Sequence, residues 1–199
     1  MFTGIIEAFG TIQKVSEEHT NKTFWISSSI SSLLKIDESL SHNGVCLTIE
    51  EIENNMHRVT AIKETLDKTN LQSWKQGDIV NLERSMQMNG RIDGHIVQGH
   101  IDGIGKCISK KDLEGSFEFT FSFDEDNGEL IIEKGSICVN GVSLTAFNVS
   151  RNTFTVAIIP YTFEHTNFKN IKEGDIVNLE FDMLGKYVAR IMKINANEL

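Results

Sequence analysis

The sequence predicts an all-β protein made of two small, similar β-barrels in tandem, followed by one C-terminal α-helix. Three observations predict this fold class: an internal repeat, short β-type runs separated by turn signals, and one amphipathic segment near the end. The chain has 199 residues, which at about 100 to 200 residues per domain allows one large domain or two small ones. With 40% hydrophobic and 24% charged residues, it has the composition of a globular protein with a core.

The second part of the chain repeats the first. Residues 42–86 align without a gap on residues 139–183, at a constant offset of 97, with 20 identities in 45 positions. Upstream, residues 4–10 resemble residues 99–105 after a two-residue gap. A repeat of about half the chain indicates a duplication. We therefore predict an N-terminal domain over residues 1–95 and a related C-terminal domain over residues 96–185.

Short β-strands are expected in both domains. The pairs Asn43-Gly44 and Asn140-Gly141 lie between apolar runs and are typical of hairpin turns. Residues 115–123 alternate phenylalanine with other residues, which indicates a strand with one buried face. Residues 153–159 form a further β-rich run. Many short strands at this spacing favour two small barrels over a parallel α/β sheet.

The last segment differs from both repeats. Leu184, Val188, Ile191 and Ile194 recur at helical spacing, and the basic residues between them lie off this stripe. We therefore predict an amphipathic helix, assigned as a separate C-terminal oligomerisation element over residues 186–199. Two interpretations of its apolar face stay open: packing on its own barrel, or contact with another copy of the chain.

Charge and cysteine content exclude several classes of protein. The net charge of −9 argues against binding to nucleic acid or to acidic membranes. Cys46, Cys107 and Cys138 are far apart and show no Cys-x-x-Cys spacing, so neither a disulfide framework nor a zinc site is predicted. The chain has no signal-peptide pattern and no apolar run long enough to span a membrane. We expect a cytoplasmic protein without a metal site.

Seven motifs in order resemble one known family. They are MFTGIIE at 1–7, HNGVCLT at 42–48, ETL at 64–66, GHIVQGHIDG at 94–103, NGVSLT at 140–145, IPYTFEHT at 159–166 and LGKYV at 184–188. Together they are similar to the riboflavin synthase alpha chain, a family with a lumazine-binding repeat. The resemblance implies two six-stranded Greek-key barrels plus a C-terminal helix. It also implies a homotrimer whose active sites lie between the N-terminal barrel of one subunit and the C-terminal barrel of its neighbour.

The resemblance implies the reaction as well. One molecule of 6,7-dimethyl-8-ribityllumazine transfers a four-carbon unit to another, giving riboflavin and 5-amino-6-ribitylamino-pyrimidinedione, the last step of riboflavin biosynthesis. The family uses neither a metal nor a redox cofactor. An association with the lumazine-forming enzyme, lumazine synthase, is left open. Two homologous pockets suit two copies of one substrate, and positions where the repeats differ are then the ones expected to distinguish donor from acceptor.

Five residues are expected to carry the chemistry. Cys46 aligns with Ser143, and the resemblance places both in the site, Cys46 as a nucleophile or a group that positions water. His100 aligns with Ile5, so one pocket alone has an imidazole suited to proton transfer. Phe2 is expected to close over a neighbouring ligand, or else to anchor a strand. Asp182, which aligns with Ser85, is expected to orient the substrate, with surface charge as the plainer interpretation.

The substrate-binding residues are expected at strand ends, where backbone groups are free to bond. They are Gly4, Ile5, Ile6, Ser39, Cys46, Leu47, Thr48, Thr60, Ala61, Ile62, Gly99, His100, Ile101, Lys134, Ser143, Leu144, Thr145, Ile159, Pro160, Tyr161, Thr162 and Phe163. We expect His95 to pair a strand or to support a neighbouring group, and Cys107 and Cys138 to be core thiols.

Four residues depart from the family pattern. Asp93 stands where a glycine is usual, Tyr161 where a histidine is common, and Asp67-Lys68 where basic residues are frequent. These departures put loop conformation and affinity in doubt more than the reaction. The main rival is a non-enzymatic antenna protein that binds lumazine or flavin on the same scaffold. A second rival is a tandem barrel with a structural or protein-binding role.

Overall fold

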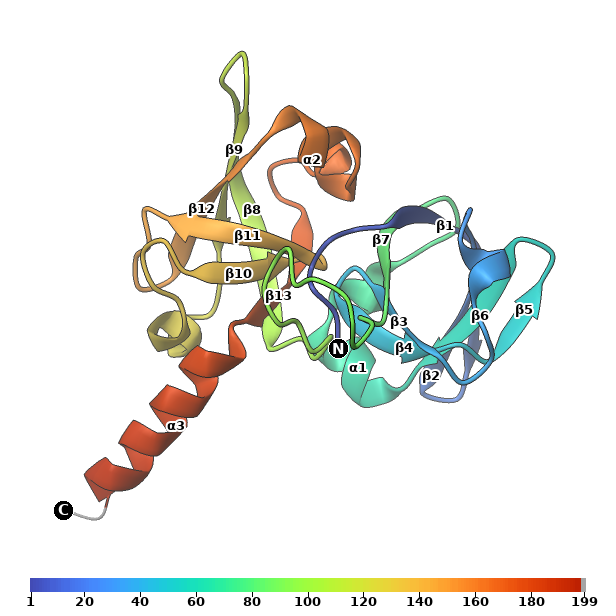
Figure 1. Ribbon diagram of the computed structural model, residues 1–199, viewed down its shortest axis with the longest axis horizontal. Coiled ribbons are helices and arrows are strands. Elements are labelled where there is room, and N and C mark those ends of the chain that lie inside the picture. The colour runs from blue at the N-terminus through green and yellow to red at the C-terminus, as the bar shows by residue number, and fades with distance from the viewer. Residues whose placement is uncertain (198–199) are drawn as a thin grey trace.

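The computed structural model describes residues 1–197, and the side chains of residues 1–195. It contains two β units side by side and a C-terminal helix that projects from the second unit (Figure 1). We call residues 1–95 the N half and residues 96–197 the C half. Each half starts with a short extended stretch ahead of its first long strand, and we call residues 1–6 and 96–101 the leading segments.

The N half is a seven-stranded antiparallel sheet with the strand order β4-β3-β7-β1-β2-β6-β5. Its strands are β1 (Ala8–Glu18), β2 (Asn21–Ser27), β3 (Ser39–His42), β4 (Val45–Thr48), β5 (Glu51–Glu53), β6 (Met56–Ala61) and β7 (Ile79–Arg84). Its helical turns are η1 (Ser31–Leu33), α1 (Lys63–Lys68) and η2 (Asn70–Ser73).

The C half is a closed barrel with the order β10-β11-β12-β9-β8-β13. Its strands are β8 (Gly103–Asp112), β9 (Phe117–Ser122), β10 (Ser136–Val139), β11 (Val142–Phe147), β12 (Thr153–Ile158) and β13 (Ile176–Phe181). Its helices are η3 (Glu125–Leu130), α2 (Pro160–Glu164), η4 (Asn167–Asn170) and the terminal α3 (Met183–Asn197).

The predicted pair of related barrels is confirmed, with one difference in the N half. There the single strand β11 of the C half is represented by two shorter strands, β4 and β5, because the ladder is interrupted at Ile49 and Glu50. One backbone bond, from the Glu50 N–H to the Arg58 carbonyl at 3.0 Å, still links this stretch to β6. The N half is therefore a barrel-like sheet whose closure is incomplete at this point.

Each half has its own hydrophobic core. In the C half, Phe119 and Phe121 are fully buried, as the alternation of residues 115–123 predicts. Phe117, on the same face, is half-buried and stacks on Phe163 of α2, with ring centroids 3.7 Å apart. Cys107 and Cys138 are buried thiols, which confirms the prediction for both.

The leading segments meet where the halves join. Phe2 and Val97 exchange two backbone hydrogen bonds, of 2.7 and 3.0 Å, and both side chains are buried. Beside them the two Asn-Gly turns lie back to back: a Cβ atom on Gly44 would come within 2.9 Å of the Gly141 nitrogen. Equivalent residues of the two repeats therefore contact each other, so the halves are related by an approximate two-fold axis through this junction.

A group of asparagines at this axis links the halves. They occupy the same three positions in each repeat: Asn43, Asn70, Asn81, Asn140, Asn167 and Asn178. The side-chain amide of Asn81 donates to the Asn140 carbonyl at 2.9 Å, and that of Asn178 donates to the Asn43 carbonyl at 3.0 Å. The backbone N–H groups of Asn167 and Asn70 donate to the side-chain oxygens of Asn81 and Asn178, each at 2.7 Å. Each amide thus bonds across the junction in both directions.

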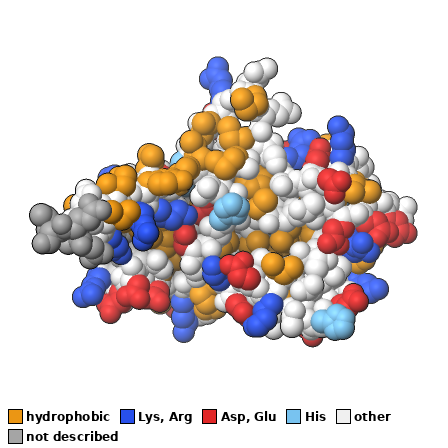
Figure 2. Space-filling model, turned by 90° about the horizontal axis from the view of Figure 1, so that it is seen from below, with side chains coloured by type: hydrophobic (Ala, Val, Ile, Leu, Met, Phe, Trp, Pro, Cys, Tyr) orange, Lys and Arg blue, Asp and Glu red, His pale blue; other side chains and the backbone are white. Residues whose placement is uncertain are grey.

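Helix α3 begins three residues earlier than predicted, because Asp182 caps it: the Asp182 carboxylate accepts from the Leu184 N–H at 3.0 Å. Residues 198–199 of the predicted segment lie outside the described residues. Along α3, Leu184, Val188 and Ile191 are 70%, 57% and 56% exposed. Packing of this apolar stripe on its own barrel is therefore wrong for this chain. Figure 2 shows hydrophobic side chains gathered along α3 and beyond it on the same face. No described helix is long and apolar enough to cross a membrane.

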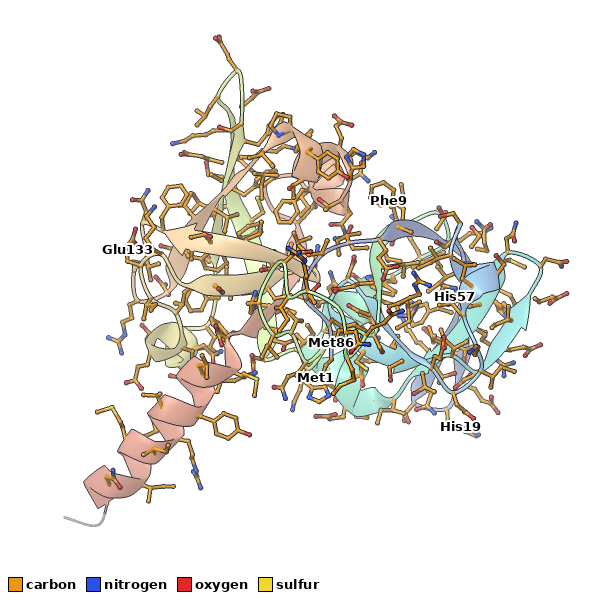
Figure 3. All side chains as sticks on the ribbon, in the orientation of Figure 1. Met1, Phe9, His19, His57, Met86 and Glu133 are labelled. Carbon is orange, nitrogen blue, oxygen red and sulfur yellow. The ribbon has the colours of Figure 1, made fainter. Side chains whose placement is uncertain are left out.

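A chain of buried hydrogen bonds runs through the N half alone. The His42 Nδ1 lies 3.1 Å from the Leu40 carbonyl, which can only accept, so this nitrogen carries the proton. His57, inside the N half in Figure 3, then donates from Nε2 to His42 Nε2 at 2.9 Å and accepts from the Ser31 hydroxyl at 2.8 Å. Both rings are therefore neutral. Burial lowers the pKa of His42 well below its usual value and that of His57 to about 4.

This pair makes the stability of the N half sensitive to acid. Because both pKa values fall on folding, the unfolded chain binds protons that the folded chain does not. The free energy of unfolding should fall by up to about 1.4 kcal/mol per pH unit for each histidine below about pH 6.5. A triple variant, Ser31→Ala, His42→Val and His57→Phe, removes the chain of hydrogen bonds. Its new Val and Phe are the residues that the C half has at the equivalent positions, Val139 and Phe154. In urea unfolding, the free energy of unfolding of this variant should depend less on pH than that of the wild type. An unchanged slope would contradict the assignment of neutral rings.

Candidate functional site

The leading segments cross between the halves in the same manner at two places. The leading segment of the C half lies on the N half, where the Cys46 N–H donates to the Gly99 carbonyl at 2.9 Å. The leading segment of the N half lies on the C half, where the Ser143 N–H donates to the Gly4 carbonyl at 2.8 Å. We call the first crossing, which borders a cavity, the Cys46 pocket. We use the name Ser143 pocket for the equivalent residues around Ser143, which line none of the cavities found in the described part of the chain. Each contains strand residues of one repeat and backbone from the other.

Glycine is required where each segment crosses the strand. Gly99 and Gly4 have φ values of +82° and +78°, a region that other residues rarely adopt. A Cβ atom on Gly99 would lie 2.6 Å from the Cys46 Cβ, and one on Gly4 would lie 2.5 Å from the Ser143 Cβ. Only a residue without a side chain allows the segment to approach so closely.

The Cys46 pocket is a cavity of about 230 Å³. Its lining residues are Cys46, Glu64, Thr65, Lys68, Thr69, Gly99, His100 and Ile101. The structure thus brings together four predicted residues, two of them the candidate nucleophile Cys46 and the candidate base His100. The other four come from α1 and the residue that follows it, and sequence analysis missed them. Their signal was the Thr-x-x-x-Thr-Asn pattern, which both repeats contain at 65–70 and 162–167.

The Ser143 pocket has a different partner for its central side chain. The Ser143 hydroxyl lies 2.7 Å from Nδ1 of His95, and the His95 N–H donates to the Thr3 carbonyl at 3.1 Å. Burial lowers the pKa of His95, and the negative charge of Asp182 opposes this effect. Sequence analysis expected His95 to pair a strand or support a neighbour, and the structure shows both. Its direct contact with Ser143 was not anticipated, because residue 95 lies outside the parts of the two repeats that align.

The equivalent helices α1 and α2 differ in charge. On α1, Glu64 and Lys68 form an ion pair of 2.7 Å. At the equivalent positions on α2, Tyr161 and His165 stack with ring centroids 4.1 Å apart. A charged pair therefore borders the Cys46 pocket, whereas the equivalent residues of the C half are an aromatic pair. This adds to the differences between Cys46 and Ser143 and between His100 and Ile5.

Phe2 lies beneath the Cys46 pocket. Its side chain is fully buried, and it packs with Val97, Cys138 and Cys46. A Cβ atom on Gly99 would lie 2.8 Å from the Phe2 ring. Of the two interpretations given to Phe2, its position within this chain is that of an anchor for the leading segment, and its role toward a neighbouring ligand stays a prediction.

Several predicted binding residues lie in the cores or are engaged elsewhere. Leu47 and Ala61 are buried in the N-half core, and Leu144 and Phe163 pack against the C-half core. The Thr60 hydroxyl lies 3.0 Å from both Thr23 and Glu50. Of these five, Leu47 and Ala61 are buried and the other three are half-buried, and their binding roles stay predictions.

The remaining predicted residues are partly or fully exposed. The Lys134 ammonium lies over the Phe147 ring at 5.0 Å. Ser39 and Ile5 line a separate cavity of about 510 Å³. Ile6 is half-buried and packs against the core of the C half. The others are exposed or half-buried on the surface of their own half: Thr48, Ile62, Thr145, Ile159, Pro160 and Thr162.

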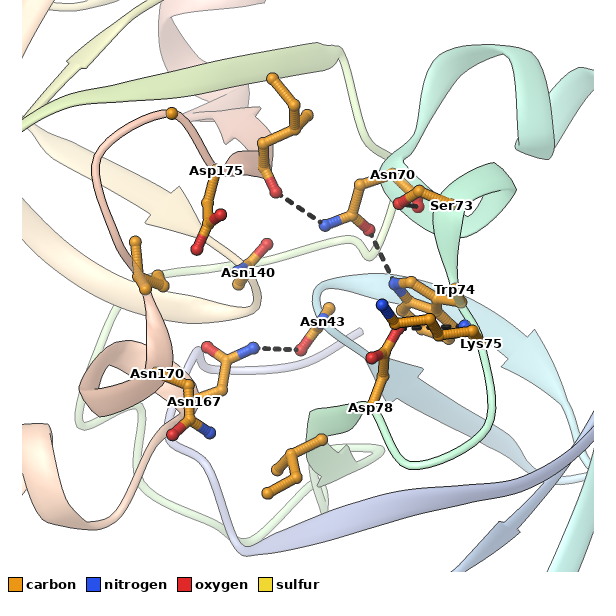
Figure 4. Close-up of a pocket in the computed structure, with 14 residues that line it drawn as sticks. Asn43, Asn70, Ser73, Trp74, Lys75, Asp78, Asn140, Asn167, Asn170 and Asp175 are labelled. Atoms are coloured by element: carbon orange, nitrogen blue, oxygen red, sulfur yellow. Dashed lines mark hydrogen bonds between the residues drawn. The ribbon is translucent and has the colours of Figure 1, made fainter.

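A larger groove lies at the approximate two-fold axis (Figure 4). It has a volume of about 480 Å³ and is lined by residues such as Asn43, Asn140 and Trp74. The Asn167 amide that points into it donates to Asn43 at 3.0 Å, and the Trp74 indole donates to Asn70 at 3.1 Å. Because these polar groups already bond one another, the groove serves the junction of the halves, and the crossed pockets are the better candidates for a ligand site.

Comparisons with known proteins agree with this arrangement. The lumazine binding domain family matches residues 3–85 and again residues 98–182. A riboflavin synthase of Bacillus amyloliquefaciens is 37% identical over 96% of this chain and 90% of its own. A riboflavin synthase of Saccharomyces cerevisiae is 34% identical over 96% of this chain and 85% of its own.

The chain belongs to the riboflavin synthase family. Both lumazine-binding repeats of this family member coincide with the two halves of the structure. Among solved structures, LumP complexed with riboflavin has a TM-score of 0.86 at 22% identity, covering 92% of this chain and all of that chain. LumP complexed with 6,7-dimethyl-8-(1'-D-ribityl) lumazine has a TM-score of 0.83 at 23% identity. These two likenesses show the fold.

The close approach of Gly99 to Cys46 can be tested directly. In Gly99→Ala the added methyl group should push the leading segment away and weaken the bond from the Cys46 N–H. Hydrogen exchange of this amide should then become faster by at least about tenfold. Gly77→Ala is the matched control, because Gly77 has a φ of +92° but no neighbouring atom within 4 Å. Equal effects of both substitutions on the Cys46 amide would contradict the proposed contact.

Proposed function

We propose that this chain is a riboflavin synthase. It transfers a four-carbon unit between two molecules of 6,7-dimethyl-8-ribityllumazine and forms riboflavin and 5-amino-6-ribitylamino-pyrimidinedione. The observation that carries the proposal is the pair of equivalent crossings whose central residues, Cys46 and Ser143, differ, because two identical substrates must be bound in unequal roles. The names of the full-length relatives support the same reaction.

The Cys46 pocket supplies the groups for addition and proton transfer. Cys46 is half-buried at the cavity wall, where its thiol can add to an electron-poor ring carbon or hold a water that does so. His100 lines the same cavity, and its imidazole is suited to removing a proton from a substrate methyl group near neutral pH. The aligned residue Ile5 has no such group, so this step is assigned to the Cys46 pocket.

The Ser143 pocket supplies a neutral, oriented hydroxyl. The bond of 2.7 Å between Ser143 and His95 fixes the hydroxyl, and burial favours the uncharged form of the imidazole. A neutral pair of this kind can donate or accept a hydrogen bond without adding charge to the pocket. The substrate bound there is therefore held in an environment different from that at Cys46, as unequal donor and acceptor roles require.

The reaction is tested by mixing the protein with 6,7-dimethyl-8-ribityllumazine, without added metal or nucleotide. Riboflavin and the pyrimidinedione should form in equal amounts, as measured by absorbance and chromatography. His100→Ala should lower kcat about a hundredfold, since a positioned base typically contributes this much or more. His19→Asn, in an exposed turn of the N half, should leave kcat unchanged. Tight binding of the lumazine without turnover would instead identify an antenna or storage protein.

The assembly proposed for the chain is a homotrimer in the cytoplasm, with each active site completed by the neighbouring subunit. The exposed apolar stripe of α3 supports a contact between copies, because such a stripe is normally covered by another protein surface. In this arrangement the Cys46 pocket of one subunit faces the Ser143 pocket of the next. Association with lumazine synthase is left open by the sequence, and co-purification of the two proteins would reveal it.

Sedimentation equilibrium tests the role of α3. The wild-type chain should have the mass of a trimer, and Val188→Asp with Ile191→Asp should reduce it to that of a monomer. The control is Arg190→Glu, off the apolar stripe, which changes the net charge by the same two units and should leave the trimer intact. A trimer that survives the paired aspartates would show that α3 is not its contact.

A further inference from the structure

Two buried glutamates lie outside the pockets at equivalent positions of the repeats. Glu83 on β7 is 4% exposed and Glu180 on β13 is 1% exposed. Their strand neighbours Leu82 and Leu179 belong to the hydrophobic cores. A carboxylate is costly to bury unless it has hydrogen-bond partners, so the partners indicate what each glutamate does.

The partners of both glutamates are the leading segments. Glu83 accepts hydrogen bonds from the Thr3 N–H at 2.7 Å, the Thr3 hydroxyl at 2.8 Å and the Gly4 N–H at 2.9 Å. Glu180 accepts from three consecutive N–H groups, those of Gln98 at 2.6 Å, Gly99 at 2.9 Å and His100 at 3.1 Å. Each carboxylate therefore binds the leading segment of its own half through both oxygens.

The segment that each glutamate holds belongs to the pocket of the opposite half. The Gly99 carbonyl, held beside Glu180, accepts from Cys46, and the next residue is His100, which lines the Cys46 pocket. The Gly4 carbonyl, held beside Glu83, accepts from Ser143. A carboxylate in the last strand of one half is thus one peptide unit away from the central residue of the other pocket.

We propose that Glu180 is the positioning residue of the Cys46 pocket and Glu83 that of the Ser143 pocket. Each fixes a leading segment on its own strand and so determines where that segment closes the pocket across the junction. The identity of the ligand rests on the proposed function. The positioning of each pocket by a glutamate of the opposite half does not. Neither glutamate lines the Cys46 pocket, so each acts through the backbone that it binds.

Glutamine cannot replace either residue fully. Its amide group has one oxygen and one NH₂ group, so at least one backbone N–H of the segment would face another donor. A buried donor without an acceptor weakens the local structure enough for about a tenfold change in an equilibrium. The effect should be confined to the segment that has lost its acceptor, whereas a loss of general stability would affect both pockets.

Thiol alkylation can read the two pockets separately. Cys46 is the half-buried thiol, while Cys107 and Cys138 are buried and burial raises the pKa of both. With iodoacetamide and mass spectrometry, Glu180→Gln should speed alkylation of Cys46 about tenfold, because the Gly99 segment covers it. The matched control Glu83→Gln should change this rate less than about twofold.

The reciprocal experiment places the thiol in the other pocket. In a Cys46→Ser, Ser143→Cys background, the pattern should reverse, with Glu83→Gln now the variant that speeds alkylation. The proposal would be overturned if one glutamine variant sped alkylation of the thiol at 46 and of the thiol at 143 equally, or if neither variant changed either rate. If a glutamine variant fails to fold, Glu83→Asp and Glu180→Asp keep both carboxylate oxygens and are compared in the same way.

A ligand arm separates this proposal from the proposed function. With 6,7-dimethyl-8-ribityllumazine present, Glu180→Gln should need about tenfold more ligand than wild type to protect Cys46, and Glu83→Gln should not. If the lumazine fails to protect wild-type Cys46, the proposed function is wrong, while the ligand-free rates still decide the positioning roles.

Discussion

The crossed hydrogen bonds at the approximate two-fold axis are the constraint on which the rest of this structure depends. The two repeats place the same asparagines at the junction of the halves. A buried side-chain amide needs both a hydrogen-bond donor and an acceptor as partners. The copies meet this requirement for each other, since Asn81 bonds to Asn140 while Asn178 bonds to Asn43. These hydrogen bonds at the junction therefore fix how the two halves are oriented.

Because of this orientation, the leading segment of each half lies on the strands of the other half. Phe2 and Val97, equivalent residues of the repeats, pair at the axis. From there each leading segment continues onto a strand of the other half, at Gly4 and Gly99. Neither pocket is complete in one half alone. A duplication that had separated into two independent barrels would have two strand faces but would lack the backbone that closes them.

Within this shared scaffold the halves have become chemically unequal. Cys46 stands opposite Ser143 in the alignment, and an ion pair at Glu64 replaces the aromatic stack at Tyr161. The N-half core contains the hydrogen-bonded pair of His42 and His57 where the C half has apolar residues. Similar backbones with different side chains suit a reaction between two identical substrates, because the two substrates must take unequal roles.

The sequence by itself determined the duplication, the β-class of both halves, the terminal helix and the family, because repeats, alternation and motifs are local patterns. Through the resemblance it also named Cys46 and His100 as site residues, but not that they line the same pocket. The tertiary structure alone decided that the leading segments cross, that His95 bonds to Ser143 and that Glu83 and Glu180 are buried against backbone N–H groups. These contacts join residues about 50 to 80 positions apart. The relative placement of the two folded halves creates them, and no local pattern in the chain records that placement.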